Sequence, residues 1–274
     1  MDNRAIGVFD SGLGGLTAVK RLRELLPGED IVYLGDTGRV PYGGRSRETL
    51  IEYAKQDVKF LSRYDVKAIV IACNTVSANA LEEAENTVDV PVIGVIDPAV
   101  KRAAEITGNG KIGVIGTAAT IKSGIYLKKI GKTMPEARVT AVACPLLVPL
   151  VEDGRIHRGD IVIETVLKEY LEPVKRAGAD TLILGCTHYP LLEGIIRDIM
   201  GEGVSLINSG GVTAETVAGF LKERGLLADR NPGKTCYFVT DDTESFEKTA
   251  SLFLGESLNG KVSRVSLEER PVRP

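Results

Sequence analysis

The sequence contains no tryptophan, few other aromatic residues and only two histidines. Its 274 residues include 8 Tyr, 6 Phe and 2 His. Platforms that stack nucleic-acid bases need exposed aromatic rings, so this composition argues against a single-strand-binding module. The chain also lacks a large excess of charge of either sign, because 34 Lys and Arg nearly balance 37 Asp and Glu. No long-range field gathers nucleic acid or anionic lipid, and we expect neither as a partner.

Long apolar runs are absent as well. No stretch approaches the length of a membrane span. The first four residues, Met-Asp-Asn-Arg, lead straight into a strand pattern without the apolar core of a signal peptide. We therefore expect a cytoplasmic protein that does not enter the membrane.

The four cysteines lack the short spacings of a zinc site or a Cys-x-x-Cys redox pair. They stand at positions 73, 144, 186 and 236. With two histidines in the chain, a Cys/His metal site would need scattered residues, so we expect reduced thiols and no metal. Free cysteines are often small buried hydrophobic residues, and this is our interpretation of Cys144 and Cys236.

The sequence does contain a regular alternation of apolar strand patterns and amphipathic helix patterns. Hydrophobic residues make up 43% of the chain, enough for a full core. Strands are predicted at 5–9, 31–34, 68–72, 91–96, 111–117, 138–143, 181–184, 204–207 and 235–239. Helices are predicted at 16–26, from a cap at Ser46 to about 64, and at 76–86, 118–130, 161–177, 212–224 and 243–253. This order predicts an α/β fold with mostly parallel sheets.

The pattern restarts near residue 111, which suggests a diverged duplication. We predict two similar doubly wound domains, related by a pseudo-twofold axis. The first would comprise residues 1–97 plus 208–274, and the second residues 98–207. Weak self-similarity is also what any two doubly wound units share. If the duplication is real, strand-end groups of the two domains face one interdomain cleft, where the active site is expected.

Two strand ends carry a thiol followed by polar groups. Residues 181–184 lead through Gly185 into Cys186-Thr187-His188, and residues 68–72 lead into Cys73-Asn74-Thr75. Parallel α/β sheets hold ligands at such ends, and a thiolate is a strong nucleophile and soft base. For one cysteine the structural interpretation would be preferred. Two of them, each followed by hydrogen-bond donors, favour a paired-thiol site.

Other candidates are weaker. Asp10-Ser11-Gly12 also ends a strand, and its glycines let backbone amides approach an anion, although a tight turn is an equal alternative. His188 is a stronger candidate for a general acid or base because Cys186 lies two residues away, whereas His157 is interpreted as a surface residue. Glu152 is expected to end a surface helix with a carboxylate that can reach the cleft.

Taken together, these stretches resemble the glutamate racemase family within the aspartate/glutamate racemases. The matching segments are 8–15, 41–43, 72–78, 94–96, 144–146, 148–152 and 184–190. They cover about residues 6–210, and the set in this order is specific to the family. Asp10-Ser11 and the histidine after Cys186-Thr187 look like the glutamate branch. One departure is Asn208, where the family often has Asp.

The resemblance implies cofactor-independent interconversion of L- and D-glutamate, which supplies D-glutamate for bacterial peptidoglycan. Cys73 would remove the α-proton from D-glutamate and Cys186 from L-glutamate, each returning a proton on the opposite face. Asp10 would assist Cys73, and His188 would assist Cys186 with Glu152 as a supporting acid. The implied substrate-binding residues are Asp10, Ser11, Tyr42, Gly43, Asn74, Thr75, Thr187 and His188. No cofactor or metal is implied, and we expect a homodimer.

Three alternatives stay open at this point. The first is a racemase for another acidic or cyclic substrate. The second is a non-catalytic module that binds an amino acid or a phosphate compound. The third, a thiol redox enzyme, is disfavoured because the chain has no Cys-x-x-Cys pair.

Overall fold

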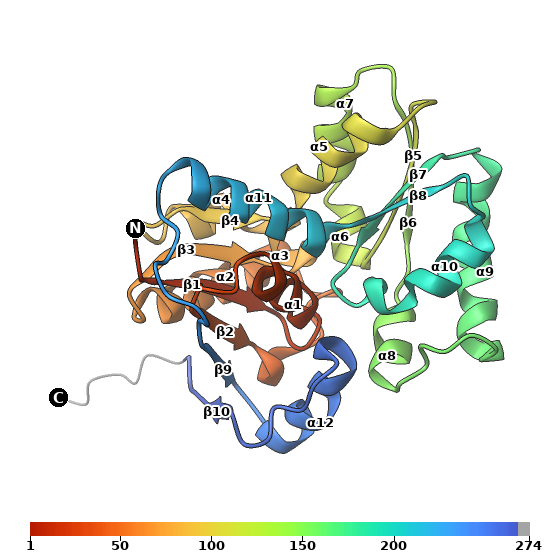
Figure 1. Ribbon diagram of the computed structural model, residues 1–274. Helices are drawn as coiled ribbons and strands as arrows, with labels where there is room; N and C mark the ends of the chain where they lie inside the picture. The colour runs from red at the N-terminus through yellow and green to blue at the C-terminus, as the bar shows by residue number, and fades with distance from the viewer. Residues whose placement is uncertain (268–274) are drawn as a thin grey trace.

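Two parallel sheets organise the molecule (Figure 1), of which the computed structural model describes residues 1–267. The six-stranded sheet has the order β10 (Val262–Arg264), β9 (Thr235–Val239), β2 (Ile31–Gly35), β1 (Ala5–Asp10), β3 (Val66–Ile71) and β4 (Val92–Gly94). The four-stranded sheet has the order β6 (Arg138–Ala143), β5 (Lys111–Gly116), β7 (Thr181–Gly185) and β8 (Ser205–Asn208). All of these pairings are parallel, which confirms the predicted α/β class.

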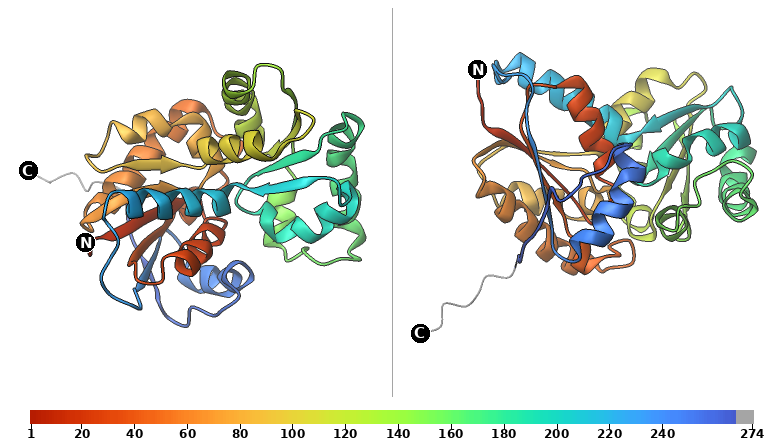
Figure 2. Two further views of the ribbon diagram at one scale, coloured as in Figure 1. Left: turned by 45° about the horizontal axis from the view of Figure 1, so that its top comes forward. Right: turned by 60° about the horizontal axis from the view of Figure 1, so that its bottom comes forward.

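Helices connect the strands and cover both sheets (Figures 1 and 2). Those of the N-terminal part are α1 (Leu16–Leu25), η1 (Thr37–Arg39), α2 (Arg47–Ser62), α3 (Asn74–Asn79), α4 (Leu81–Glu85) and α5 (Ile96–Ile106). The middle part has α6 (Ala118–Lys122), α7 (Ile125–Thr133), α8 (Leu147–Glu152), α9 (Ile161–Arg176), η2 (Tyr189–Leu192) and α10 (Glu193–Met200). The chain returns through α11 (Ser209–Glu223) and continues to α12 (Thr243–Leu254). As predicted, Ser46 caps α2, and its Oγ accepts a hydrogen bond from the Thr49 amide at 3.3 Å.

The core lies on both faces of each sheet. Strands β1, β3 and β7 are buried along their whole length, as expected for parallel strands between two helix layers. Successive side chains alternate between faces. Ile6 and Val8 join the apolar cluster that includes α1 and α11, while Phe9 joins the cluster beneath α2. In the other sheet, Ile183 packs with α5 and α7.

The predicted helix at 76–86 and the predicted helix at 118–130 each consist of two shorter helices. The first is interrupted between α3 and α4 at Ala80, whose φ of −143° is not helical. The second is interrupted between α6 and α7 at Gly124, which has a left-handed φ of +67°.

The predicted strand at 91–96 is wrong in its second half. Strand β4 ends at Gly94, and α5 begins at Ile96. A proline is tolerated in the first helical turn, where its missing N–H would have no partner, and Asp97 suits the same turn electrostatically. Pro98 therefore lies inside the helix rather than after a strand. Strand β10 was not predicted.

Four neighbouring strands have the same order in both sheets. Strand order β2-β1-β3-β4 in one corresponds to β6-β5-β7-β8 in the other. This order is consistent with a duplication, although doubly wound units share it. The domain boundaries after residue 97 and before residue 208, and the pseudo-twofold relation, stay predictions. Residues 268–274 of the predicted first domain lie outside the described residues.

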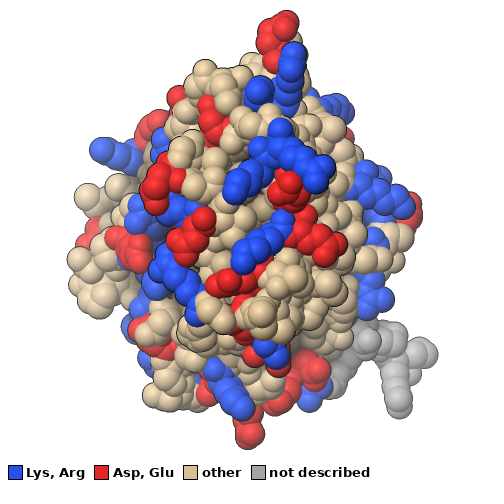
Figure 3. Space-filling view, turned by 90° about the vertical axis from the view of Figure 1, so that its right-hand side faces the viewer, with Lys and Arg blue, Asp and Glu red and all other residues tan. Residues whose placement is uncertain are grey.

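The surface over α9 and α10 carries both signs of charge interleaved (Figure 3). Ion pairs such as Arg158–Asp198, Arg176–Glu172 and Arg197–Glu193 account for part of this pattern. Within residues 1–267, we find no helix with the length and apolar character that a membrane crossing requires.

Candidate active site

A cavity of about 410 Å³ lies between the carboxyl ends of the two sheets. Loops after β1, β2 and β3 line it from one side, and loops after β5, β6 and β7 line it from the other. Every residue predicted for the site contributes to the lining except Asp10: Ser11, Tyr42, Gly43, Cys73, Asn74, Thr75, Glu152, Cys186, Thr187 and His188. The fold also brings together residues that are 177 positions apart, such as Asp10 and Thr187.

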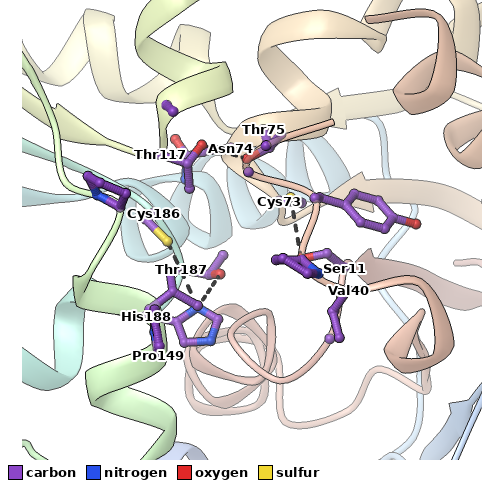
Figure 4. Close-up of a pocket in the computed structure, with 18 of the residues that line it drawn as sticks. Ser11, Val40, Cys73, Asn74, Thr75, Thr117, Pro149, Cys186, Thr187 and His188 are labelled. Atoms are coloured by element: carbon purple, nitrogen blue, oxygen red, sulfur yellow. Dashed lines mark hydrogen bonds between the residues drawn. The ribbon is translucent and has the colours of Figure 1, made fainter. Parts of the chain in front are cut away.

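The two cysteines enter the cavity from different sheets (Figure 4). Cys73 follows β3 and occupies the N-cap position of α3, whereas Cys186 directly follows β7. Figure 4 shows them on opposite sides of the pocket. Their exposed fractions are 5% and 6%. All four cysteines of the chain are free thiols, as predicted.

Cys73 lies in a surrounding that favours the neutral thiol. Burial raises the pKa of Cys73 to about 12, and the nearby Asp10 carboxylate adds to this effect. The Val76 amide and Ser11 oppose the shift only in part. The Cys73 Sγ donates a hydrogen bond to the Ser11 Oγ at 3.8 Å. At neutral pH this thiol is a proton donor.

Cys186 has a histidine and a carboxylate in series beside it. Its Sγ lies 3.9 Å from the His188 Nδ1, and the His188 Nε2 lies 2.9 Å from the Glu152 Oε1. Burial lowers the pKa of His188, but the hydrogen bonds to Cys186 and Glu152 outweigh burial and raise it to about 10. His188 is therefore a cation at neutral pH. Glu152 ends α8, and its side chain is 40% exposed.

Asp10 lies behind the cavity wall, between the two cysteine regions. It is fully buried and accepts hydrogen bonds from the Gly12 amide (3.1 Å) and the Thr187 Oγ1 (3.4 Å). Burial raises the pKa of Asp10, although the charge of His188 and backbone amides oppose this. The carboxyl group thus contacts Thr187, the residue after Cys186, and its charge also acts on Cys73.

Close packing of two loops makes this arrangement possible. A Cβ added at Gly14 would lie 2.1 Å from the Thr187 Oγ1 and 2.6 Å from the His188 Nδ1. Such distances are far below van der Waals contact, so only glycine fits between the β1 loop and the β7 loop. The glycines after Asp10 therefore serve close approach, a role their sequence pattern did not reveal.

The loop that carries Tyr42 and Gly43 is held from below by buried charges. The Tyr42 hydroxyl donates to Asp36, and Arg39 pairs with both Asp36 (2.5 Å) and Asp57 (3.0 Å). Burial and the two carboxylates raise the pKa of Tyr42, so its hydroxyl stays protonated. At the tip of the loop, the carbonyl of Gly43 accepts a hydrogen bond from the Ala119 amide at 2.9 Å, which joins the two sides of the cavity.

Sequence reasoning missed Thr117 and the apolar part of the wall. Thr117 caps α6, and its hydroxyl lies 2.9 Å from that of Thr75 across the cavity. Its position directly after β5, equivalent to the loop after β1, was the available signal. The apolar lining comes from Val40, Pro41, Pro145, Val148 and Pro149, with Cys144 beside them.

Residues outside the site also bear on the predictions. Cys144 is buried as predicted, but the prediction for Cys236 is wrong because its side chain is exposed. Tyr237 and Val239 are buried on one face of β9. On the other face Phe238 packs against Phe60, while Cys236 stays exposed. His157 is exposed, as expected. Asn208 caps α11 and accepts a hydrogen bond from the Gly211 amide at 3.0 Å.

The arrangement defines a class of site. A buried thiol on one side and a thiol with an imidazolium partner on the other can act on opposite faces of one small molecule. Hydroxyl and amide groups between them can bind carboxylates. Within the described part of the chain, no three His, Cys, Asp or Glu side chains gather as ligands for a metal ion.

Comparison with known proteins identifies the group to which this site belongs. The model of the Asp/Glu/Hydantoin racemase family matches residues 24–217. A glutamate racemase from Geobacter metallireducens is 47% identical over 266 residues, which cover 97% of each chain. One from Aquifex aeolicus is 47% identical and covers 94% of this chain and 97% of its own.

Solved structures agree. A glutamate racemase isoform from Bacillus anthracis has a TM-score of 0.93 at 40% identity, covering 97% of this chain and 99% of its own. A glutamate racemase from Francisella tularensis, solved with D-glutamate, has a TM-score of 0.91 at 39% identity, with coverage of 98% and 100%. The chain belongs to the glutamate racemase family and is an isomerase.

Proposed function

We propose that this protein interconverts L- and D-glutamate without a cofactor, by proton transfer between Cys73, Cys186 and the α-carbon of the substrate. The observation that carries the proposal is the pair of thiols, which enter one cavity from two sheets. Inversion of a stereocentre by proton transfer needs a base on one face and an acid on the other, each about 3–3.5 Å from its reaction partner.

In the direction from L- to D-glutamate, the Cys186 thiolate takes the α-proton, and the Cys73 thiol gives its proton to the opposite face of the same carbon. One C–H bond breaks and another forms, and the negative charge passes from Cys186 to Cys73. The reverse direction exchanges the two roles. Between the steps, donors on the α-carboxylate stabilise the carbanion in a cavity with little water. Thr75, Thr117 and Thr187 line the cavity and would supply such donors.

In the free protein, Cys73 is prepared for the L to D direction. Burial raises the pKa of Cys73 to about 12, so this residue holds a proton ready for transfer. On the other side, the Cys186 Sγ lies 3.9 Å from the His188 Nδ1, and Glu152 balances the charge of the imidazolium. After turnover, the two thiols must exchange their protonation states, and the exposed Glu152 offers a path to solvent.

The remaining predicted residues would bind the substrate. Cavity-lining residues assigned to the carboxylates and the ammonium group are Ser11, Asn74, Thr75 and Thr187, with Tyr42 and Gly43 on the loop after β2. Asp10 and His188 would contribute from the back wall. Support for glutamate as the substrate comes from the names of the relatives and from the Francisella structure with D-glutamate.

The test follows racemisation of L-glutamate in deuterated water with dialysed protein and no added cofactor. We expect optical rotation to fall to zero, and newly formed D-glutamate to carry deuterium at the α-carbon from the first turnovers. The remaining L-glutamate should stay unlabelled at that stage. Unchanged rotation would refute the activity, and D-glutamate without deuterium would refute the two-base scheme.

Cysteine variants test the assignment of the bases. Cys73→Ala and Cys186→Ala each remove one acid–base group of the pair. Each substitution should therefore reduce the rate of racemisation by about 10³-fold. Cys236→Ala, which changes an exposed thiol remote from the cavity, is the control and should retain wild-type activity. Normal turnover in either of the first two variants would contradict the assignment.

We further propose a cytoplasmic homodimer that supplies D-glutamate for bacterial peptidoglycan. This biological role is the one that membership of the family implies. Light scattering of the purified protein should give twice the chain mass, and cell fractionation should find the protein in the cytoplasmic fraction. Expression in a bacterium that depends on external D-glutamate should remove that dependence. A monomer, a membrane fraction or continued dependence would each refute its part of the proposal.

A further inference from the structure

A chain of buried hydrogen bonds connects the segment after Cys73 with the strand before Cys186. The Tyr126 hydroxyl donates to the Asn74 Oδ1 (2.7 Å), and the Asn74 Nδ2 donates to the Ser209 Oγ (2.9 Å). Ser209 in turn donates to the carbonyl of Leu184 at 3.0 Å. None of these four residues is more than 2% exposed. The connection therefore does not compete with water.

The direction of the hydrogen bonds is determined by the last acceptor. A carbonyl oxygen only accepts, so the Ser209 hydroxyl must donate to Leu184 and accept from Asn74. The amide nitrogen of Asn74 therefore faces Ser209, and its oxygen faces the Tyr126 hydroxyl. This leaves one N–H of the Asn74 amide for a substrate in the cavity. A chain with a single proton arrangement holds its members in one geometry.

A second contact joins the same two segments. A Cβ at Gly185 would lie 3.4 Å from the Tyr126 Cε2, so the tyrosine ring packs directly against the residue before Cys186. Tyr126 itself is fixed in the apolar cluster of α5 and α7. Asn74, the residue after Cys73, is thus tied to the end of β7 by two routes, one through Tyr126 and one through Ser209. Figure 4 shows Asn74 on the wall between the two cysteines.

We propose that Tyr126 and Ser209 are positioning residues that set the distance between the two thiols. Neither belongs to the cavity lining, so each acts through Asn74 or the end of β7. The inference rests on the proposed two-cysteine reaction, in which both sulfur atoms must reach one carbon. A displacement of about 1 Å costs on the order of 10²-fold in rate in such an arrangement.

The test compares Tyr126→Phe and Ser209→Ala with the wild-type protein in both directions. Tyr126→Phe keeps the ring against Gly185 and removes only the hydroxyl. We expect kcat to fall by about 10- to 100-fold in both variants while KM changes little, because positioning acts on the transition state. The primary isotope effect with α-deuterated glutamate should increase. The double variant should be slower than either single variant, because each substitution breaks one of the two routes that tie Asn74 to the end of β7.

Thr213→Val is the matched control. Thr213 is fully buried on α11, and its Oγ1 donates to the Ser209 carbonyl at 2.7 Å inside the helix. This variant loses a buried hydrogen bond of the same helix, so its unfolding temperature should fall while kcat stays at the wild-type value. Unchanged kcat in the folded Tyr126→Phe and Ser209→Ala proteins would overturn the inference, as would an equal loss in the control. A wild-type protein that does not racemise glutamate would instead overturn the proposed function, and this inference with it.

Discussion

At the scale of single residues, the two thiols differ in what surrounds them. Cys73 lies near the Asp10 carboxyl group, whereas Cys186 lies next to an imidazolium. Negative charge nearby favours the protonated thiol, as at Cys73. Two chemically identical side chains thus lie in different electrostatic surroundings before substrate arrives.

The pKa of Cys73 predicts how this residue reacts with iodoacetamide. With a pKa of about 12, its thiolate fraction rises tenfold per pH unit, so its alkylation rate should rise about 100-fold between pH 8 and pH 10. Peptide mass spectrometry separates this rate from that of the exposed Cys236. A rate for Cys73 that levels off below pH 9 would contradict the prediction.

The same shift makes stability depend on pH. Because the folded pKa of Cys73 is raised, its contribution to stability is fully present below the unfolded pKa of about 8.5 and is lost as pH rises through about 12.

The partner side can be tested through His188. In a His157→Gln background only one histidine remains, so its ring signals can be followed by NMR. We expect titration near pH 10, and a pKa lower by about one unit when Glu152→Gln removes the carboxylate. Because the folded pKa is raised, the charge on His188 stabilises the protein below about pH 6.5, and this stability is lost through pH 10. An unchanged titration in Glu152→Gln would show that Glu152 does not support the imidazolium.

At the scale of elements, the loops after the strands build the site, and the strands hold them at fixed positions. The loop after β1 touches the loop after β7, and the loop after β2 touches the start of α6. These contacts cross from one sheet to the other. The two sheets thus fix the positions of the binding groups that the loops carry.

Gly14→Ala tests the closest of these contacts. The added methyl group would overlap Thr187 and His188, so the β7 loop must move away from Asp10. Because a shift of about 1 Å costs on the order of 10²-fold, we expect kcat/KM to fall at least that much while the protein still folds. Gly131→Ala on α7 is the control, because the new methyl group would point into open space and meet no neighbour outside the backbone of its own helix. That variant should keep its activity and gain about 0.5–1 kcal/mol of stability. Wild-type kcat/KM in Gly14→Ala would refute the packing argument.

At the scale of the whole molecule, the cavity lies between two sheets that the chain connects twice. Chain segments cross between the sheets after β4 and again at α11, which packs against both α1 and α5 (Figure 2). A ligand in the cavity contacts both sides at once. Binding should therefore couple the two parts and exclude water from the thiols.

We expect glutamate to stabilise the protein against heat. A racemic mixture avoids net turnover, and at 100 times the dissociation constant it should add about 2.7 kcal/mol of stability. For a chain of this size that corresponds to a rise of roughly 5–10 °C in the unfolding temperature, measured by circular dichroism. Racemic lysine at the same concentration is the control and should have little effect. Equal shifts with both amino acids would contradict specific binding of glutamate.

The sequence by itself determined the elements and the chemical groups. Alternating apolar runs predicted nearly every strand, because buried parallel strands must be apolar on both faces. The two cysteines were singled out because each stands at the end of such an apolar run and is followed by polar residues. Short elements with mixed patterns were harder to predict. For that reason, the predicted strand ran past the start of α5, and Cys236 was wrongly expected to be buried.

Only the tertiary structure decided which groups meet. Local patterns carry no information about the separation of two strand ends that are more than a hundred residues apart, because long-range packing sets it. The closeness of Gly14 to His188, the support of Tyr42 by buried charges and the connection from Tyr126 to Leu184 all arise from that packing. The chain therefore specifies its two sulfur atoms locally, while the contact between two sheets places them around one cavity.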